Sequence, residues 1–245
     1  MLLAVVMVLG VAPAARPGES EKPAAERWYK WSISGRPTGY LHIKRSKSGV
    51  AASPVVLSVR FVARFRGQLF WQHVQAHCRD DSCLSAVKVV ITGTDDDGGR
   101  MPSTEVAFHD GKAVLTTAEG RRRAKKAPGK VVYEFTTFEV IRTLPFKKGV
   151  VLEFTQVEEG TNVKENHKIA YVGRETVSVG GEKIGLHKFE QTGQGIRPCQ
   201  YWVNDGHELV RVVMDGRKEF LLSTQEEAAA AFGIADEQER LPGRP

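Results

Sequence analysis

The chain has 245 residues, of which 41% are hydrophobic and 26% are charged, and its formal net charge is +6. This composition is typical of a globular protein with an ordinary core, and it excludes a disordered, collagenous or coiled-coil chain. Three cysteines are too few to build a small scaffold held together by disulfides. Composition thus limits the class of protein, and the order of the residues must indicate its compartment, architecture and binding roles.

The first residues have the pattern of a signal peptide. An uncharged apolar run over residues 2–11 is followed by the small residues Ala12-Pro13-Ala14, a sequence that a signal peptidase accepts. No Lys or Arg precedes the run, and in this it departs from the usual signal. The run is also too short for a membrane-spanning helix, which needs about 20 apolar residues. We therefore expect a signal peptide over residues 1–14, a flexible lead-in over residues 15–26, and a secreted or periplasmic protein.

Alternation of apolar and polar residues dominates the rest of the chain and predicts β-strands. The clearest strand is Val55–Phe65, which places apolar residues on one face and Ser58, Arg60 and Arg64 on the other. Tight hairpin turns are expected where alternating segments are separated by dipeptides that tolerate positive φ angles. These dipeptides are Asp110-Gly111, Gly180-Gly181, Asp205-Gly206 and Asp215-Gly216. Together with the other alternating segments, these hairpins indicate roughly ten antiparallel strands.

Two short helices are expected among the strands. In the middle of the chain, Thr137 is a candidate N-cap for a helix that carries Phe138 and Ile141 on one side. Near the C-terminus, Thr224 begins a capping box, and Gly233 closes the helix that follows.

We predict a mainly β fold: a single large curved antiparallel sheet, a half-barrel or open barrel, in one domain over residues 27–233. A loose tail is expected over residues 234–245. A sheet that wraps incompletely around the mid-chain helix leaves an apolar groove suited to an acyl chain. The candidate lining residues are Trp31, Phe61, Phe65, Trp71, Phe138 and Ile141. The alternative is that these side chains are ordinary core residues, which is the commoner role of large apolar side chains.

Cys78 and Cys83 are candidates for a disulfide. If the two aspartates between them form a hairpin tip, the cysteines face each other across the ladder, and an oxidising compartment favours the bond. The alternatives are free thiols and a zinc site with His73 and His77, but side chains four apart on a strand are separated by about 13 Å. Cys199 is left over, and it could pair with either of the others.

The sharpest concentration of charge is the basic run Arg121–Lys126. Clustered cations attract the phosphates of nucleic acids, but no recognition helix, zinc finger or aromatic RNA-binding signature accompanies the run. We therefore expect no nucleic-acid partner. We interpret the run as a solvated loop that can make peripheral contact with anionic lipid headgroups.

No catalytic or cofactor-binding template fits the sequence. Asp95-Asp96-Asp97 begins like a calcium loop, but Val106 occupies the position of the closing glutamate. His207-Glu208 begins like a zinc protease motif, but the second histidine is missing. We therefore predict no catalytic residue, metal or cofactor. The enzymatic alternative is a hydrolase that gathers histidines from distant strands, with His42, His109, His167 and His187 as candidates.

Several segments resemble exported bacterial β-proteins. These segments are Trp28-Tyr29, Gly39-Tyr40-Leu41-His42, Gly180-Gly181-Glu182-Lys183-Ile184, Tyr201-Trp202-Val203 and Leu209-Val210-Arg211-Val212. Their order looks like that of periplasmic families of unknown function that are grouped loosely with the LolA/LppX lipoprotein carriers. The similarity is a pattern over Arg27–Ser223 and is sharp only over Val177–Leu222. It implies a curved antiparallel half-barrel with a hydrophobic concavity that binds lipids or lipidated proteins without catalysis.

The leading hypothesis is an exported, non-enzymatic protein that binds an apolar small molecule or a lipidated protein in the concavity of its sheet, as a carrier in the cell envelope does. The alternative is an interaction module with a filled core and no ligand, whose sheet edge or basic loop docks another envelope protein. A filled concavity favours the second hypothesis.

Overall fold

The computed structural model describes residues 25–65, 68–94, 99–158, 162–193, 195 and 198–232. The predicted signal peptide, the predicted tail and the calcium-like aspartates at 95–97 lie outside these residues. Most of the predicted lead-in also lies outside them, but its last two residues, Ala25 and Glu26, already belong to the first strand. No helix within the described ranges is long and apolar enough to span a membrane.

The strands of the first half are β1 Ala25–Ile33, β2 Arg36–Lys47, β3 Val55–Phe65, β4 Gln68–Cys78, β5 Ala86–Thr94, β6 Arg100–His109, β7 Lys112–Thr116, β8 Arg122–Lys126 and β9 Val131–Tyr133. A turn of 3₁₀ helix over Glu134–Thr136 leads into α1 Thr137–Ile141. The second half comprises β10 Val151–Glu158, β11 Asn162–Val179, β12 Glu182–Thr192, β13 Cys199–Val203, β14 Leu209–Met214, β15 Lys218–Ser223 and α2 Gln225–Phe232.

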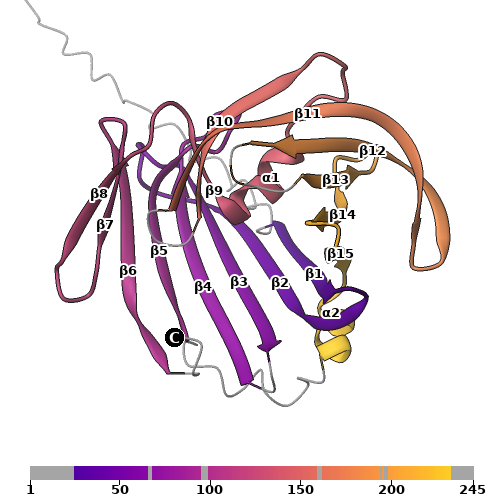
Figure 1. Ribbon diagram of the computed structural model, residues 1–245, viewed down its shortest axis with the longest axis horizontal. Helices are drawn as coiled ribbons and strands as arrows, with labels where there is room; N and C mark the ends of the chain where they lie inside the picture. The colour runs from indigo at the N-terminus through magenta and orange to yellow at the C-terminus, as the bar shows by residue number, and fades with distance from the viewer. Residues whose placement is uncertain are drawn as a thin grey trace, which may run out of the picture.

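The fifteen strands of the described residues form one sheet, in the order β8-β7-β6-β5-β4-β3-β2-β1-β15-β14-β13-β12-β11-β10-β9. Figure 1 shows this sheet curled around α1. Neighbouring strands are antiparallel, except that β9 and β10 run parallel. The fold class is as predicted: mainly β, with one large open sheet and two short helices.

The two ends of the sheet approach each other without closing a barrel. Val106 and Ala113, from one end, share an apolar cluster with Val131 and Val157, from the other. In the sheet, however, β8 and β9 are the terminal strands and are not paired with each other. Apolar side chains therefore close this side of the molecule, where a full barrel would have a ladder of backbone hydrogen bonds.

The predicted strand Val55–Phe65 is confirmed with both of its boundaries. Leu57, Val59 and Ala63 point to the concave face and are buried in the main core. Ser58 and Arg60 occupy the alternate positions, which face outward because successive side chains of a strand point to opposite faces. The alternation of apolar and polar residues therefore predicted both the position of this strand and its buried face.

The predicted hairpin turns form at Asp110 and Asp215, whose φ angles are 51° and 56°. The turn predicted at Asp205-Gly206 is different. Its positive φ angle falls on His207, at 60°, because the Asn204 side chain organises a longer loop. Asn204 Oδ1 accepts hydrogen bonds from the backbone N–H groups of Gly206 and Glu208, at 3.0 Å and 2.9 Å.

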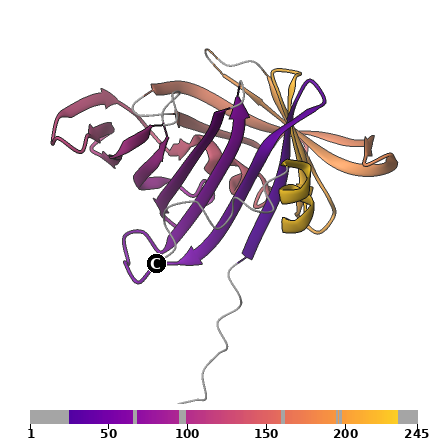
Figure 2. The same ribbon diagram turned by 90° about the horizontal axis from the view of Figure 1, so that it is seen from below.

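The two helices differ in how they begin. Thr137 does not cap α1, because it is the first residue of the helix and its hydroxyl donates to the carbonyl of Glu134, at 2.6 Å. Thr224 caps α2 as predicted, since its Oγ1 accepts from the N–H of Glu227, at 3.1 Å. Figure 2 shows α2 beside the first strands, on the outer side of the sheet. There Ala228 is fully buried in a cluster with Tyr40.

The predicted disulfide between Cys78 and Cys83 is not formed, and both residues are buried free thiols. Cys78 is opposite Ala86 in the ladder, so Cys83 does not lie across from it. The intervening residues form a loop centred on Asp81, whose Oδ1 accepts from the N–H groups of Cys83 and Ser85, at 3.0 Å and 2.9 Å. The aspartate thus organises a loop where a tight hairpin tip was expected.

All three cysteines are expected to titrate as free thiols when the chain is unfolded without reductant. In the folded chain, burial raises the pKa of Cys78 and of Cys199 to about 12, so little reactive thiolate is present at neutral pH. Mass spectrometry after alkylation, with and without denaturant, measures both states. Only one alkylated cysteine in the unfolded, unreduced chain would contradict the structure, because it would reveal a disulfide.

Candidate functional site

The concave side of the sheet is filled by α1. Phe138 is fully buried and makes edge-to-face contacts with Tyr29, Tyr201 and Phe220, at centroid distances of 5.4, 6.4 and 5.4 Å. Ile141, one turn later on the same helix, is also fully buried in this core. The helix predicted to cover a groove is therefore the centre of the packed core.

Of the predicted groove-lining residues, Trp31, Phe138 and Ile141 are buried in the main core, and Phe61 is partly buried and packs against it. Trp71 lies on the outer face, where it packs against the small cluster of Tyr40, Val62 and Ala228. The register of β4 explains this, since Gln72 and Val74 are the buried residues of the alternation. The side chain of Phe65 lies outside the described part of the structure.

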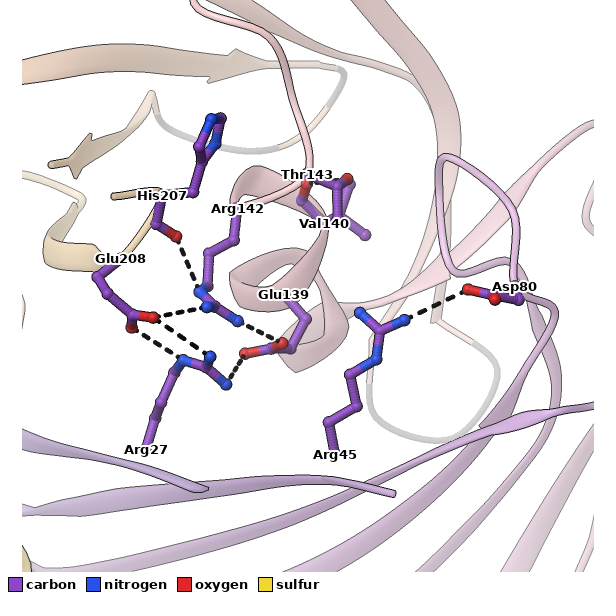
Figure 3. A network of polar contacts seen from close by, with 9 residues as sticks. All are labelled: Arg27, Arg45, Asp80, Glu139, Val140, Arg142, Thr143, His207 and Glu208. Atoms are coloured by element: carbon purple, nitrogen blue, oxygen red, sulfur yellow. Dashed lines mark hydrogen bonds and ion pairs between the residues drawn. The ribbon is translucent and has the colours of Figure 1, made fainter. Parts of the chain in front are cut away.

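A network of four charged side chains fixes α1 to the sheet (Figure 3). Glu139 of α1 is fully buried and accepts from Arg27 of β1, at 3.3 Å, and from Arg142, at 2.9 Å. Both arginines also contact Glu208, at 3.0 Å and 2.7 Å. Arg142 Nε donates to the carbonyl of His207, at 3.0 Å. With two guanidinium groups and two carboxylates, the network is neutral and joins α1, β1 and the loop before β14.

Acidification is expected to weaken this network at Glu208. Burial raises the pKa of Glu208, but hydrogen bonding from Arg27 and the charge of Arg142 lower it more, so the pKa lies below its ordinary value of 4.5. A carboxyl group whose pKa is lower in the folded state stabilises the fold above its ordinary pKa, and this contribution is lost as pH falls through the folded pKa. The unfolding free energy should therefore decrease below pH 4.5.

Urea unfolding at several pH values from neutral to below 4.5 measures this loss. The Glu208→Gln variant should show a shallower acid-side decrease than the wild type, because it has no carboxylate to protonate. Glu182→Gln, at the exposed first residue of β12, is the matched control and should follow the wild type. Equal acid slopes for Glu208→Gln and the wild type would show that the network does not couple to pH.

A second polar network lies beside α1, and we call its members Tyr201, Gln191, Gln156 and His167 the floor network. All are at most 5% exposed. The Tyr201 hydroxyl donates to Gln191 Oε1, at 2.5 Å, and Gln191 Nε2 donates to Gln156 Oε1, at 2.5 Å, and to His167 Nδ1, at 3.0 Å. A Cβ atom on Gly193 would lie 2.6 Å from the His167 ring, so glycine is required there.

The floor network borders a pocket of about 440 Å³, which we call the polar pocket. It is lined by Glu134, Thr137, Gln156, Glu158, Lys164, Gln191, Gly195, Cys199, Tyr201, Met214, Asp215, Arg217 and Lys218. Most of these side chains are polar, and the charged ones are of both signs. The volume falls in the range of small-molecule sites. A neighbouring pocket of about 450 Å³, which includes His167 and Lys130, is also lined mainly by polar residues.

Tyr201 and Cys199, two titratable side chains that line the polar pocket, are protonated at neutral pH. Burial raises the pKa of Tyr201 well above its ordinary value of 10 and raises the pKa of Cys199 to about 12. The charge lies at the rim, where Lys164 pairs with Glu158, at 2.5 Å. At the β14–β15 turn, Asp215 adds one negative charge and Arg217 and Lys218 add two positive charges, and Glu134 is a further acidic side chain of the lining. The pocket can therefore offer hydrogen bonds from its floor and ion pairs from its rim.

The histidines proposed for a hydrolase each have a separate local environment. His42 stacks on Trp28 on the outer face, at 4.0 Å, and His167 belongs to the floor network. His187 lies between Tyr171 and Asp205, at 2.9 Å from each, and His109 contacts its neighbour Asp110 at an exposed hairpin. Within the described ranges, no group of three or more His, Cys, Asp or Glu residues is placed to hold a metal ion.

No family model matches the chain, and no curated protein matches it. Among solved structures, the crystal structure of a beta-barrel-like protein of the domain of unknown function DUF1849 from Brucella abortus is similar. The TM-score is 0.53 at 10% sequence identity, and the match covers 81% of this chain and 95% of that chain. The fold is β-barrel-like. The likeness concerns the fold alone, and it supports the predicted resemblance to β-proteins of unknown function, whereas the finer resemblance to the LolA/LppX carriers stays a prediction.

Proposed function

We propose that the chain is an exported binding protein that holds a small polar molecule in the polar pocket. The observation that carries this proposal is the floor network, whose buried side chains are already held by one another. Such a floor binds without reorganisation, and preorganisation of this kind favours affinity. Export is inferred from the signal-like pattern of residues 1–14.

The rim of the polar pocket favours a ligand that carries charges of both signs. Asp215 is half-buried, and Arg217 and Lys218 are exposed beside it on the same turn. A molecule with one cationic and one anionic group can pair with both kinds of side chain while its middle contacts the floor network. The proposed class of ligand is therefore a small zwitterion, such as a short peptide.

An apolar or lipidated ligand, as first predicted for the concavity, would have to displace α1. That helix is held by the buried ring of Phe138 and by the ion pairs of Glu139 with Arg27 and Arg142. Breaking buried ion pairs is costly, because the remaining charges lose their partners. These contacts favour the polar pocket over the concavity as the binding site.

Thermal unfolding with added ligands tests the proposal. Zwitterionic dipeptides are the polar probes and palmitate is the apolar probe, each added to the full mature chain. A ligand that binds only the folded state raises the midpoint of unfolding. We expect stabilisation by zwitterionic dipeptides, and we expect the double variant Asp215→Asn/Lys218→Gln to lose it.

The matched control is Asp110→Asn/Lys112→Gln, which makes the same changes at the corresponding Asp-Gly turn of another hairpin. This variant should be stabilised as much as the wild type. Stabilisation by palmitate alone would contradict the proposal and support the concavity as the site. A dipeptide effect that persists in Asp215→Asn/Lys218→Gln would show that binding occurs elsewhere.

A further inference from the structure

The strand β8 forms an open edge of the sheet. It is the terminal strand at its end of the described sheet and pairs only with β7 (Figure 1). All of its side chains are exposed. An open edge of this kind is the usual template for pairing with a strand from another chain.

The backbone groups that face the open edge can be identified from the ladder. The N–H of Thr117 bonds the carbonyl of Arg121, at 3.0 Å, and the N–H of Ala127 bonds the carbonyl of Gly111, at 2.7 Å. Antiparallel pairing alternates, so the odd-numbered residues of β8 bond to β7. Arg122, Ala124 and Lys126 therefore direct their N–H and carbonyl groups outward.

The hairpin over residues 112–126 is strongly basic. It carries six cations and one carboxylate, a net charge of +5 in a chain whose total is +6. The cations are Lys112, Arg121, Arg122, Arg123, Lys125 and Lys126, and all are exposed. None of them forms an ion pair with another residue of the described ranges. This concentration of unpaired charge opposes pairing of β8 with a second copy of itself and attracts an acidic partner.

The cations lie on both faces of the hairpin. Arg122 and Lys126 share one face with Lys112, whereas Arg123 and Lys125 point to the other. A flat anionic surface such as a bilayer can contact only one of these faces. An added strand alternates its own side chains in the same way, so acidic residues on either face of it would meet cations of β8.

We propose that β8 is a docking strand for an acidic, extended segment of a partner protein, which adds to the sheet as a further strand. The backbone of Arg122, Ala124 and Lys126 supplies the hydrogen bonds, and the cations on both faces select for acidic side chains. This is strand addition at a sheet edge, with charge complementarity as the source of specificity. The proposal does not depend on the polar pocket.

Binding of a synthetic peptide that alternates glutamate with threonine and valine tests the proposal on the full mature chain. The variant Lys125→Gln/Lys126→Gln should bind about tenfold more weakly, because charge pairs across the new ladder are lost. Lys147→Gln/Lys148→Gln is the matched control, since it makes the same change in net charge at exposed lysines elsewhere, and it should bind like the wild type.

The variant Ala124→Pro tests the backbone part of the proposal. Proline removes the outward N–H of residue 124 and leaves the bonds to β7 in place, as proline at an edge strand generally does. The peptide should bind it about tenfold more weakly, whereas Ala124→Ser, which keeps the N–H, should bind normally. In the wild type, the peptide should also slow hydrogen exchange at the amides of Arg122, Ala124 and Lys126. This measurement does not depend on whether a variant folds.

Three results would overturn the proposal. One is normal peptide affinity in Ala124→Pro without slowed exchange, because charge alone would then explain the binding. Another is the absence of peptide binding at low salt. The third is stronger binding to vesicles of phosphatidylglycerol than to the peptide, because lipid headgroups would then be the occupant.

Discussion

Replacement of Glu139 by leucine is expected to lower the unfolding free energy by about 3–5 kcal/mol. The variant removes the buried carboxylate that joins α1 to Arg27 and Arg142, whose side chains are only 9% and 15% exposed. Glu208, which is 37% exposed, would then be the one carboxylate of the network left to pair with both guanidinium groups. Chemical denaturation followed by fluorescence measures the loss.

Two further variants define the origin of this effect. Glu153→Leu removes an exposed ion pair with Lys168, at 2.8 Å, and should cost at most about 1 kcal/mol. The double variant Glu139→Leu/Arg142→Leu should recover part of the stability, since one of the arginines left without Glu139 is also removed. A loss in Glu139→Leu no larger than that in Glu153→Leu would show that the network does not hold α1.

Replacement of Phe138 by alanine is expected to cost about 3–5 kcal/mol. The ring is fully buried between Tyr29, Tyr201 and Phe220, so its removal loses apolar burial and leaves a cavity in the centre of the core. The rigid sheet around it can relax only in part. The shift in the midpoint of denaturant unfolding measures the change. The slope of the unfolding free energy against denaturant concentration should stay constant if the variant keeps the fold.

Val172→Ala is the control for this prediction, because Val172 is 44% exposed on β11. Its effect should be within about 0.5 kcal/mol, as is usual for surface substitutions. If Phe138→Ala unfolds at the same denaturant concentration as the wild type, α1 is not the centre of the core. The preference for the polar pocket over the concavity would then lose its main support.

The parts of the fold that local chemistry determines could be predicted from the sequence. The alternation in Val55–Phe65 and the turns at Asp110 and Asp215 depend on residues next to one another, and the structure confirms them. The closing cluster of Val106 with Val131 depends on packing between distant strands, for which the sequence has no local signal. The parallel pairing of β9 with β10 was missed for the same reason.

The site residues were harder to predict because faces and loops depend on register. Trp71 follows two apolar residues, so the alternation of the sequence does not determine which face of β4 is buried. In the structure, the buried face carries Gln72 and not Trp71. The disulfide prediction failed because Asp81 bonds two backbone N–H groups and sets the loop. The spacing of residues shows neither which residue lies opposite a cysteine in the ladder nor which backbone N–H groups a loop carboxylate binds.

The floor network was missed because glutamine is usually an exposed residue. Gln156 and Gln191 occupy buried positions on β10 and β12. A glutamine at an inward position of a strand was the available signal. It becomes informative only when a second such glutamine is brought within hydrogen-bond distance by pairing across the sheet.

The adjacency of β1 and β15 has a consequence for how the protein folds. Trp28 is opposite Ser223, so the earliest and the latest strands of the sheet meet near its middle. Contacts between residues so distant in sequence slow folding, because a long stretch of chain must be ordered before they can form. Until β15 has emerged, each half of the sheet has an exposed inner edge, and a chaperone that covers this seam during synthesis would protect the protein from aggregation.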